Sequence, residues 1–157
     1  MKKLTVYYSY GGNTKSIAEK IHKQVGGAIV SIQTAFPYTG SYDEIVDQGQ
    51  KEIENGFMPE IKPLAENPED YDTIILGTPV WWYTFAPAVK TFLHDYRLSG
   101  KTIYPFATNG GWIGHTFKDL EKVCKGAKVE EGLNIMFDEK VLRTPPVEID
   151  RWIQNIN

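Results

Sequence analysis

A short glycine-containing loop near the N-terminus has the residue types that bind a phosphate group. It follows an apolar run that ends at Tyr8, and an amphipathic segment begins near Thr14. The two glycines let the backbone turn so that its N–H groups point inward, and the positive end of the following helix faces the same space. The residues of this candidate site are Ser9, Tyr10, Gly11, Gly12, Asn13, Thr14 and Lys15.

The composition of residues 9–15 fits more than one role for the loop. It also limits the kind of phosphate-containing ligand that the loop could bind. A tight turn with a good N-cap fits these residues as well as a phosphate site does, and Lys15 fits either a direct contact or a solvated position. The loop lacks the third glycine of the dinucleotide fingerprint and the spacing of nucleoside triphosphatases. The second apolar run ends in Gln33 and not in a carboxylate suited to a ribose diol. A single phosphate group therefore fits better than a diphosphate.

Three consecutive aromatic residues, Trp81, Trp82 and Tyr83, mark a second candidate site. No charged residue occurs between Asp72 and Lys90. A folding role would bury all three rings in the core, but adjacent loop side chains cannot all point one way, so at least one ring should face a cleft. A flat aromatic ligand would gain about 0.5–1.5 kcal/mol per ring beyond area burial. The residues of this candidate site are Thr78, Pro79, Val80, Trp81 and Trp82.

A glycine-rich stretch after a later apolar run forms the third candidate site. Its backbone amides could hydrogen-bond the polar edge of a planar ligand, while Trp112 packs against the ring of that ligand. An ordinary glycine-rich turn is the alternative. The residues of this candidate site are Thr108, Asn109, Gly110, Gly111 and Trp112.

Five apolar runs, separated by segments with helical spacing, predict an α/β fold that brings these loops together. Alternation of strand and helix, with strands apolar on both faces, implies a doubly wound parallel sheet covered by helices on each side. In such a sheet, ligands bind beyond the carboxyl ends of the strands, where the three loops lie. The predicted strands are 4–8, 28–32, 73–76, 102–107 and 129–137, and apolar stripes predict helices over 17–25, 85–96, 117–124 and 149–156.

The length of 157 residues has room for one ordinary domain, so residues 1–157 are expected to form a single domain. Thr34–Asp70 is an exception to the alternation, because it is a long polar interval between the second and third strands. Tyr42–Asn55 could form a helix there, and Gly56–Pro68 a Pro-rich return. Whether this interval covers the bound ligand or forms a partner surface is open.

Composition excludes several classes of function. The net charge is −3 and no Lys/Arg cluster exceeds two residues, so a nucleic-acid partner is not expected. The apolar run after Lys2-Lys3 is too short for a signal peptide, and no stretch is long enough to cross a bilayer, which predicts no membrane association and a cytoplasmic location.

Cys124, the only cysteine, is expected to be a packed core thiol. His22 and His94 have no ligands at metal-site spacing, so no metal site is expected.

Taken together, the three loops resemble those of the flavodoxin family over nearly the whole chain. Residues 9–14 resemble the phosphate loop of that family, residues 77–82 the loop with the flavin-stacking aromatic, and residues 108–111 the loop at the pyrimidine edge. The resemblance implies noncovalent FMN and a flavodoxin-like five-stranded sheet of order 2-1-3-4-5 in a short-chain member. Flavodoxin is itself a well-known example of ligand binding at the switch point of this fold, so the resemblance and the expected place of the site agree.

The resemblance implies an FMN-binding electron-transfer flavoprotein that needs no catalytic acid or base, with an unidentified reductase and acceptor as redox partner proteins. An NAD(P)H-dependent FMN reductase acting on quinones or similar acceptors is the alternative, because neither Thr78–Ala88 nor Thr108–Phe117 contains a carboxylate. A binding module without redox turnover is a third possibility. A monomer or weak dimer is expected.

Overall fold

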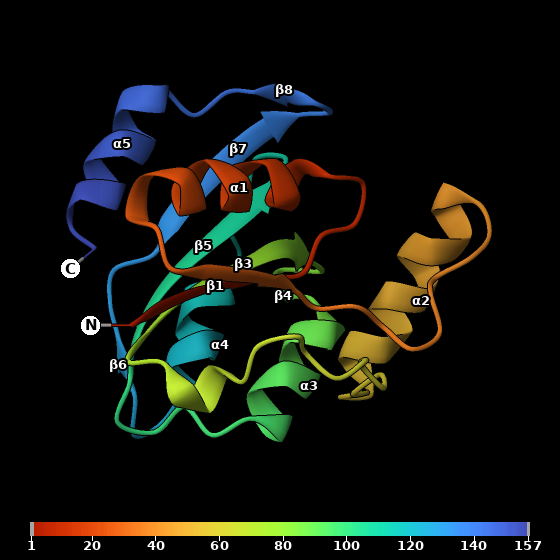
Figure 1. Ribbon diagram of the computed structural model, residues 1–157. Coiled ribbons are helices and arrows are strands. Elements are labelled where there is room, and N and C mark those ends of the chain that lie inside the picture. The colour runs from red at the N-terminus through yellow and green to blue at the C-terminus, as the bar shows by residue number, and fades with distance from the viewer. Residues whose placement is uncertain (1, 157) are drawn as a thin grey trace.

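Alternating strands and helices make up the computed structural model, which describes residues 2–156 (Figure 1). The strands are β1 (Lys3–Tyr7), β2 (Ala28–Ser31), β3 (Thr73–Trp81), β4 (Thr84–Phe85), β5 (Thr102–Asn109), β6 (Lys128–Val129), β7 (Leu133–Asp138) and β8 (Val141–Leu142). The helices are α1 (Asn13–Val25), α2 (Tyr42–Glu54), the 3-10 turn η1 (Pro68–Asp70), α3 (Pro87–Asp95), α4 (Thr116–Val123) and α5 (Pro146–Gln154). No helix among the described residues is long and apolar enough to cross a membrane.

The central sheet has the predicted topology. Its long strands run parallel in the order β2-β1-β3-β5-β7, which is the order 2-1-3-4-5 counted among these five. In register, Val6 lies between Val30 and Leu76. Two short antiparallel strands, β4 beside β3 and β8 beside β7, extend the sheet at its carboxyl edge.

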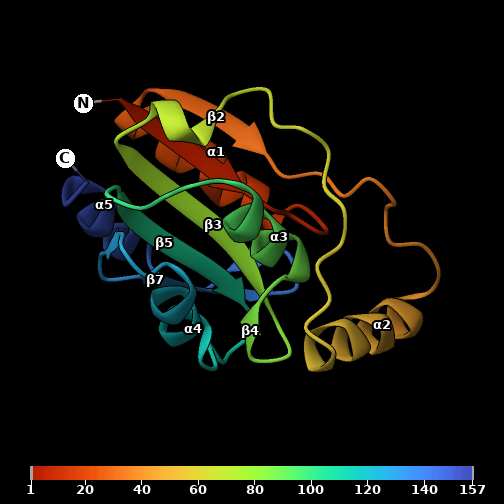
Figure 2. The ribbon, with the colours of Figure 1, turned by 90° about the horizontal axis from the view of Figure 1, so that it is seen from below.

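Helices cover both faces of the sheet, with α1 and α5 on one side and α3 and α4 on the other (Figures 1 and 2). Successive strand residues alternate between the two cores, as the period of a strand requires. Tyr7, Ile75 and Phe106 belong to the core under α1 and α5. Val6 and Leu76 belong to the core under α3 and α4. Burial on both faces explains the continuous apolar runs in the sequence.

Two of the predicted strands differ from the observed ones. The third strand reaches Trp81 and not Leu76, because it continues into a hairpin with β4. The fifth, predicted as continuous over 129–137, is split into β6 and β7, and both parts pair with β5. Pro105 of β5 lies opposite the break, since Ile103 pairs with Val129 and the next pair joins Phe106 to Leu133. Proline has no N–H for a sheet hydrogen bond, so it is tolerated where pairing stops.

The long interval between β2 and η1 is an excursion whose two limbs pair with each other. Thr34 and Ile61 form an antiparallel bridge, and the N–H of Ala35 donates to the Glu60 carbonyl at 2.8 Å. Between these limbs lies α2, which packs on neither face of the sheet and projects beyond its carboxyl edge (Figures 1 and 2). The helix predicted over 42–55 is thus observed as α2, which ends at Glu54. Ser41 and Glu44 form a capping box that fixes its start.

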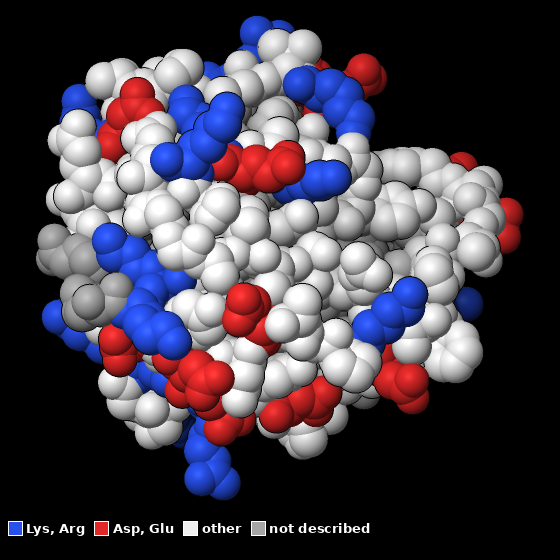
Figure 3. All heavy atoms as spheres, viewed as in Figure 1, with Lys and Arg blue, Asp and Glu red and all other residues white. Residues whose placement is uncertain are grey.

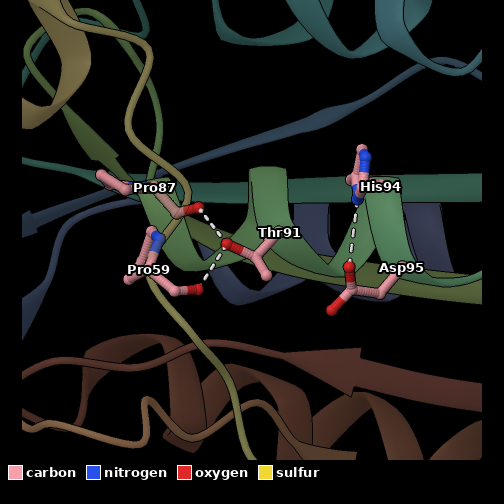
Figure 4. Close-up of polar contacts among 5 residues, drawn as sticks. All are labelled: Pro59, Pro87, Thr91, His94 and Asp95. Atoms are coloured by element: carbon pink, nitrogen blue, oxygen red, sulfur yellow. Dashed lines mark hydrogen bonds and ion pairs between the residues drawn. The ribbon is translucent and has the colours of Figure 1, made fainter.

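A buried hydroxyl attaches the return limb of this excursion to α3 (Figure 4). Thr91 Oγ1 donates to the Pro59 carbonyl at 2.7 Å, and the Pro87 carbonyl lies 3.4 Å away. One helical turn further along, His94 and Asp95 meet on the exposed surface at 3.1 Å (Figure 4). The His94–Asp95 pair shares no partner with the buried Thr91 contact that holds the excursion.

Cys124 is buried in the core under α3 and α4, as predicted. Burial raises the pKa of its thiol to about 11 because the thiolate is disfavoured away from water. We expect the native protein at about pH 8 to react with a disulfide reagent roughly 100-fold more slowly than the unfolded chain. Timed labelling with and without guanidinium chloride checks this, and equal rates in the two conditions would contradict it.

Candidate functional site

A cavity of about 460 Å³ opens at the carboxyl ends of β1, β3 and β5. Its size lies within the roughly 300–1,000 Å³ range of small-molecule sites. All three sequence-predicted loops contribute to it, as do α2 and the turn between β7 and β8. The lining residues are Tyr10, Asn13, Thr14, Tyr42, Ile45, Val46, Gly49, Pro79, Val80, Trp81, Trp82, Thr108, Asn109, Gly110, Phe137 and Glu139.

The glycine loop that precedes α1 has the geometry of an anion cradle. Gly11 and Gly12 have φ of 85° and 101°, in the left-handed region that favours glycine. Gly12 is the N-cap and gives no side chain to the first turn of α1, so the N–H groups of Asn13 and Thr14 stay available to a ligand. Ser9 Oγ accepts a hydrogen bond from the Lys15 N–H at 3.1 Å and so holds the loop against the helix. These residues fit a phosphate group.

A buried pair of hydroxyls joins the first predicted loop to the third. Thr14 Oγ1 and Thr108 Oγ1 lie 2.7 Å apart, and Thr14 is only 1% exposed. Asn109 shapes the third loop, because its Oδ1 accepts from the Gly111 N–H at 3.0 Å and its Nδ2 donates to Asn134 Oδ1 at 2.6 Å. The end of β5 is therefore fixed beside the glycine loop.

The aromatic residues of the second loop form a hairpin with a two-residue turn. Val80 pairs with Phe85 and Trp81 with Thr84, so Trp82 and Tyr83 are the central residues. Their φ values of 48° and 71° match a type I′ turn, which usually contains Asn and Gly. A left-handed conformation costs a non-glycine residue roughly 1–2 kcal/mol. Tertiary contacts must offset this cost.

Hydrogen bonds on both sides hold this hairpin. Trp82 Nε1 donates to the Val46 carbonyl of α2 at 2.9 Å, and the His115 N–H donates to the Tyr83 carbonyl at 2.8 Å. Thr78 is fully buried behind the turn, where its Oγ1 accepts from the Ala86 N–H at 3.1 Å. The strained turn is therefore clamped between α2 and the loop that precedes α4.

The two tryptophans have different surroundings. Trp81 meets three tyrosine rings edge to face, with centroid distances of 5.9, 6.1 and 5.2 Å to Tyr8, Tyr10 and Tyr38. A Cβ on Gly49 would lie 3.3 Å from the Trp81 ring, so the absence of a side chain in mid-helix allows α2 to approach it. Trp82 instead commits its indole N–H to α2. Trp81 therefore forms an aromatic wall of the cavity, whereas Trp82 anchors α2 to the hairpin.

A buried carboxylate supports this wall from behind. Glu52 of α2 is 8% exposed, and it accepts hydrogen bonds from Tyr38 OH at 2.6 Å and Gln48 Nε2 at 2.8 Å. Burial, and then the hydrogen bond to Glu52, raise the pKa of Tyr38 far above its usual value. Burial also raises the pKa of Tyr8, with Tyr10 and Glu52 adding to the shift. Both phenols therefore stay neutral beside Trp81.

Ten of the seventeen residues predicted from the sequence line the cavity, and seven lie around it. Thr78 and Ser9 brace the loops through the hydrogen bonds described above. Trp112 is 64% exposed and packs on Tyr83 with a centroid distance of 4.6 Å. The predicted residues that do not line the cavity are Ser9, Gly11, Gly12, Lys15, Thr78, Gly111 and Trp112.

Six lining residues were missed. Four come from one face of α2, at positions i, i+3, i+4 and i+7, and this amphipathic spacing was visible in the sequence. Phe137 and Glu139 follow β7, and nothing local marks them as site residues. Glu139 also brings a carboxylate to a cavity for which the two aromatic-bearing loops provide none. The missed residues are Tyr42, Ile45, Val46, Gly49, Phe137 and Glu139.

A doubly wound parallel sheet with a glycine loop, an aromatic wall and a cavity at the switch point defines a flavodoxin-like α/β protein. A family model described as Flavodoxin matches residues 2–156. The chain belongs to the flavodoxin family. The resemblance inferred from the three loops is therefore confirmed.

Individual relatives agree with this assignment. A protein of Bacteroides eggerthii DSM 20697 assigned as a flavoprotein is 31% identical, with a TM-score of 0.80 over 99% of this chain and 97% of the other. A Lactobacillus acidophilus NCFM flavoprotein in complex with FMN shares the fold, with 24% identity and a TM-score of 0.75 over 96% of this chain and 97% of its own. The Escherichia coli K12 protein named FMN reductase (NADPH) is 32% identical over 85 residues, 50% of this chain and 44% of that one. The chain spans less than half the length of the curated relatives it matches.

Proposed function

We propose that this protein binds FMN noncovalently in the cavity and carries electrons between redox partner proteins. The observation that supports this most is the convergence of a glycine loop, an aromatic hairpin and an amide-bearing loop on one space. FMN consists of a planar ring system with a polar edge, a ribityl chain and a phosphate. The phosphate, the ring and its polar edge each have a counterpart in these loops. Family membership supports the same cofactor.

Specific residues would hold the parts of FMN. The backbone N–H groups of the glycine loop and of the first turn of α1 would bind the phosphate. Trp81 and Trp82 would line the ring system, and backbone groups at Asn109 and Gly110 would meet its polar edge. The face of α2 that contains Val46 would exclude water from the ring. When bound, FMN supplies one- and two-electron redox chemistry.

Electron transfer to a partner needs a surface close to the cavity. Tyr83 and Trp112 pack against each other beside it with their rings tilted by 53°, and they are 46% and 64% exposed. Exposed aromatic rings are common in protein–protein contacts because they combine a large contact area with little flexibility. This pair supports docking of a redox protein next to the cofactor.

A direct reductase is the second candidate function. The curated relatives include an FMN reductase (NADPH) and an uncharacterised NAD(P)H oxidoreductase, each matched over about half of this chain. Much of the surface between the body of the protein and α2 is uncharged (Figure 3). Such a rim suits a neutral acceptor such as a quinone, and NAD(P)H would then be the reductant.

Two measurements on the freshly purified protein separate these functions. We expect flavin absorption bands at one equivalent of FMN per chain. For a carrier, NADPH and NADH should be oxidised at a negligible rate with a quinone, until a flavodoxin reductase is added. Rapid oxidation without that reductase would favour the direct enzyme. A protein that neither contains nor binds FMN would overturn both candidates and leave a binding module.

A further inference from the structure

We propose that Lys140, in the turn between β7 and β8, is the cation that pairs with the phosphate of the bound flavin and selects FMN over riboflavin. The inference rests on the proposed function and deepens it, because it assigns a residue outside the three predicted loops to the same site. Lys140 lies 129 positions from Gly11 in the sequence, so no local motif connects it with the glycine loop.

The position of Lys140 is set by the backbone around it. The turn consists of Glu139 and Lys140, and Glu139 has a φ of 54°. Asn13 Nδ2 donates to the Glu139 carbonyl at 2.8 Å, so the turn is fastened to the start of α1. Arg143 pairs with Asp138 at 3.1 Å and braces the hairpin from its far side. Figure 1 shows the tip of this hairpin near the loop that precedes α1.

The ammonium group of Lys140 lies over the two glycines. Lys140 Nζ donates to the Gly11 carbonyl. A Cβ on Gly11 would lie 3.4 Å from that nitrogen, and a Cβ on Gly12 would lie 3.9 Å from it. A Cβ at either position would be in van der Waals contact with the ammonium, so the ammonium lies close against both glycines, directly before the N-terminus of α1.

The charge of Lys140 is not balanced by a carboxylate. Among residues 2–156, five ion pairs are found and none includes Lys140. A neutral carbonyl is a weaker partner for an ammonium than a phosphate is. The positive end of α1 and the ammonium face the same cradle, and together they favour an anion with two charges.

Comparing FMN with riboflavin isolates the phosphate contribution. Protein stripped of flavin is titrated with each ligand by fluorescence, at low and high NaCl. In Lys140→Met we expect the Kd for FMN to rise about tenfold and the Kd for riboflavin to stay unchanged. The loss should shrink at high salt because screening already weakens the native pair. Lys140→Arg should keep most of the FMN affinity, since it keeps the charge.

A matched control and two outcomes decide the proposal. Lys23→Met makes the same change in net charge at the other end of α1, and it should leave both affinities unchanged. Equal weakening of FMN and riboflavin in Lys140→Met would overturn the proposal, because Lys140 would then act through the shape of the hairpin. Unchanged FMN affinity would also overturn it. If the unaltered protein binds neither flavin, the proposed function itself fails.

Discussion

Replacing Trp81 by alanine is expected to raise the Kd for FMN about 100-fold. The ring is one wall of the cavity, and three tyrosines and α2 position it. Removing it takes away a buried aromatic contact, worth about 1.5–3 kcal/mol in area and roughly 0.5–1.5 kcal/mol in ring interactions. Each 1.4 kcal/mol is about tenfold in affinity, so two orders of magnitude follow. Fluorescence titration of the flavin-free variant measures the change.

Trp82→Phe is the matched control for Trp81→Ala. It keeps an aromatic ring but removes the N–H that donates to the Val46 carbonyl. We expect a smaller loss of FMN affinity, together with easier proteolysis within α2, because an anchor of that helix is gone. If Trp82→Phe weakened FMN more than Trp81→Ala did, the roles assigned to the two tryptophans would be reversed.

Replacing Gly77 by alanine is expected to lower the free energy of unfolding by roughly 3 kcal/mol. Gly77 pairs with Tyr7 and Phe106 in the centre of the sheet. An added Cβ would lie 2.2, 2.7 and 2.8 Å from ring atoms of Phe106, which is fully buried and packs edge to face on Trp152. Neither ring has space to retreat, so the strand or the core must shift.

Thermal and denaturant unfolding measure the effect of Gly77→Ala. For a chain of this size, a loss of that magnitude lowers the midpoint by roughly 6–12 °C. Gly110→Ala is the control for stability, because no atom lies within 4 Å of an added Cβ there. A midpoint for Gly77→Ala equal to that of Gly110→Ala would show that the core accommodates the methyl group.

The sequence was sufficient to predict the sheet and the three loops at its carboxyl edge, and the resemblance to the flavodoxin family implied the strand order. The central strands are buried on both faces and give continuous apolar runs that amphipathic helices do not share, and glycines and aromatics mark the strand ends. Pairing with β4 extends β3 to Trp81. The residue pattern within 73–76 does not indicate this pairing, so the longer strand could not be predicted from it. Pro105 was visible in the sequence, but its effect is on the neighbouring strand, where β6 and β7 separate.

The remaining parts of the candidate site depend on contacts between distant segments. The division of roles between Trp81 and Trp82 arises from the Val46 carbonyl, 36 positions away from its donor. Glu139 and Lys140 reach the glycine loop only because β7 lies at the edge of the parallel sheet and its hairpin tip folds over α1. Local spacing cannot encode such neighbours, so Lys15 was the only cation that sequence reasoning could assign to the phosphate.

The bridge between Thr34 and Ile61 closes residues 35–60 into a single excursion. Both of its ends leave and rejoin the body at adjacent points, and Thr91 fastens the returning limb without involving any strand of the sheet. Because α2 forms the roof of the cavity and also contacts Trp81 and Trp82, a change on its inner face would reshape both ligand access and the aromatic wall. Ligand access and the position of the aromatic wall are therefore coupled through one contiguous segment.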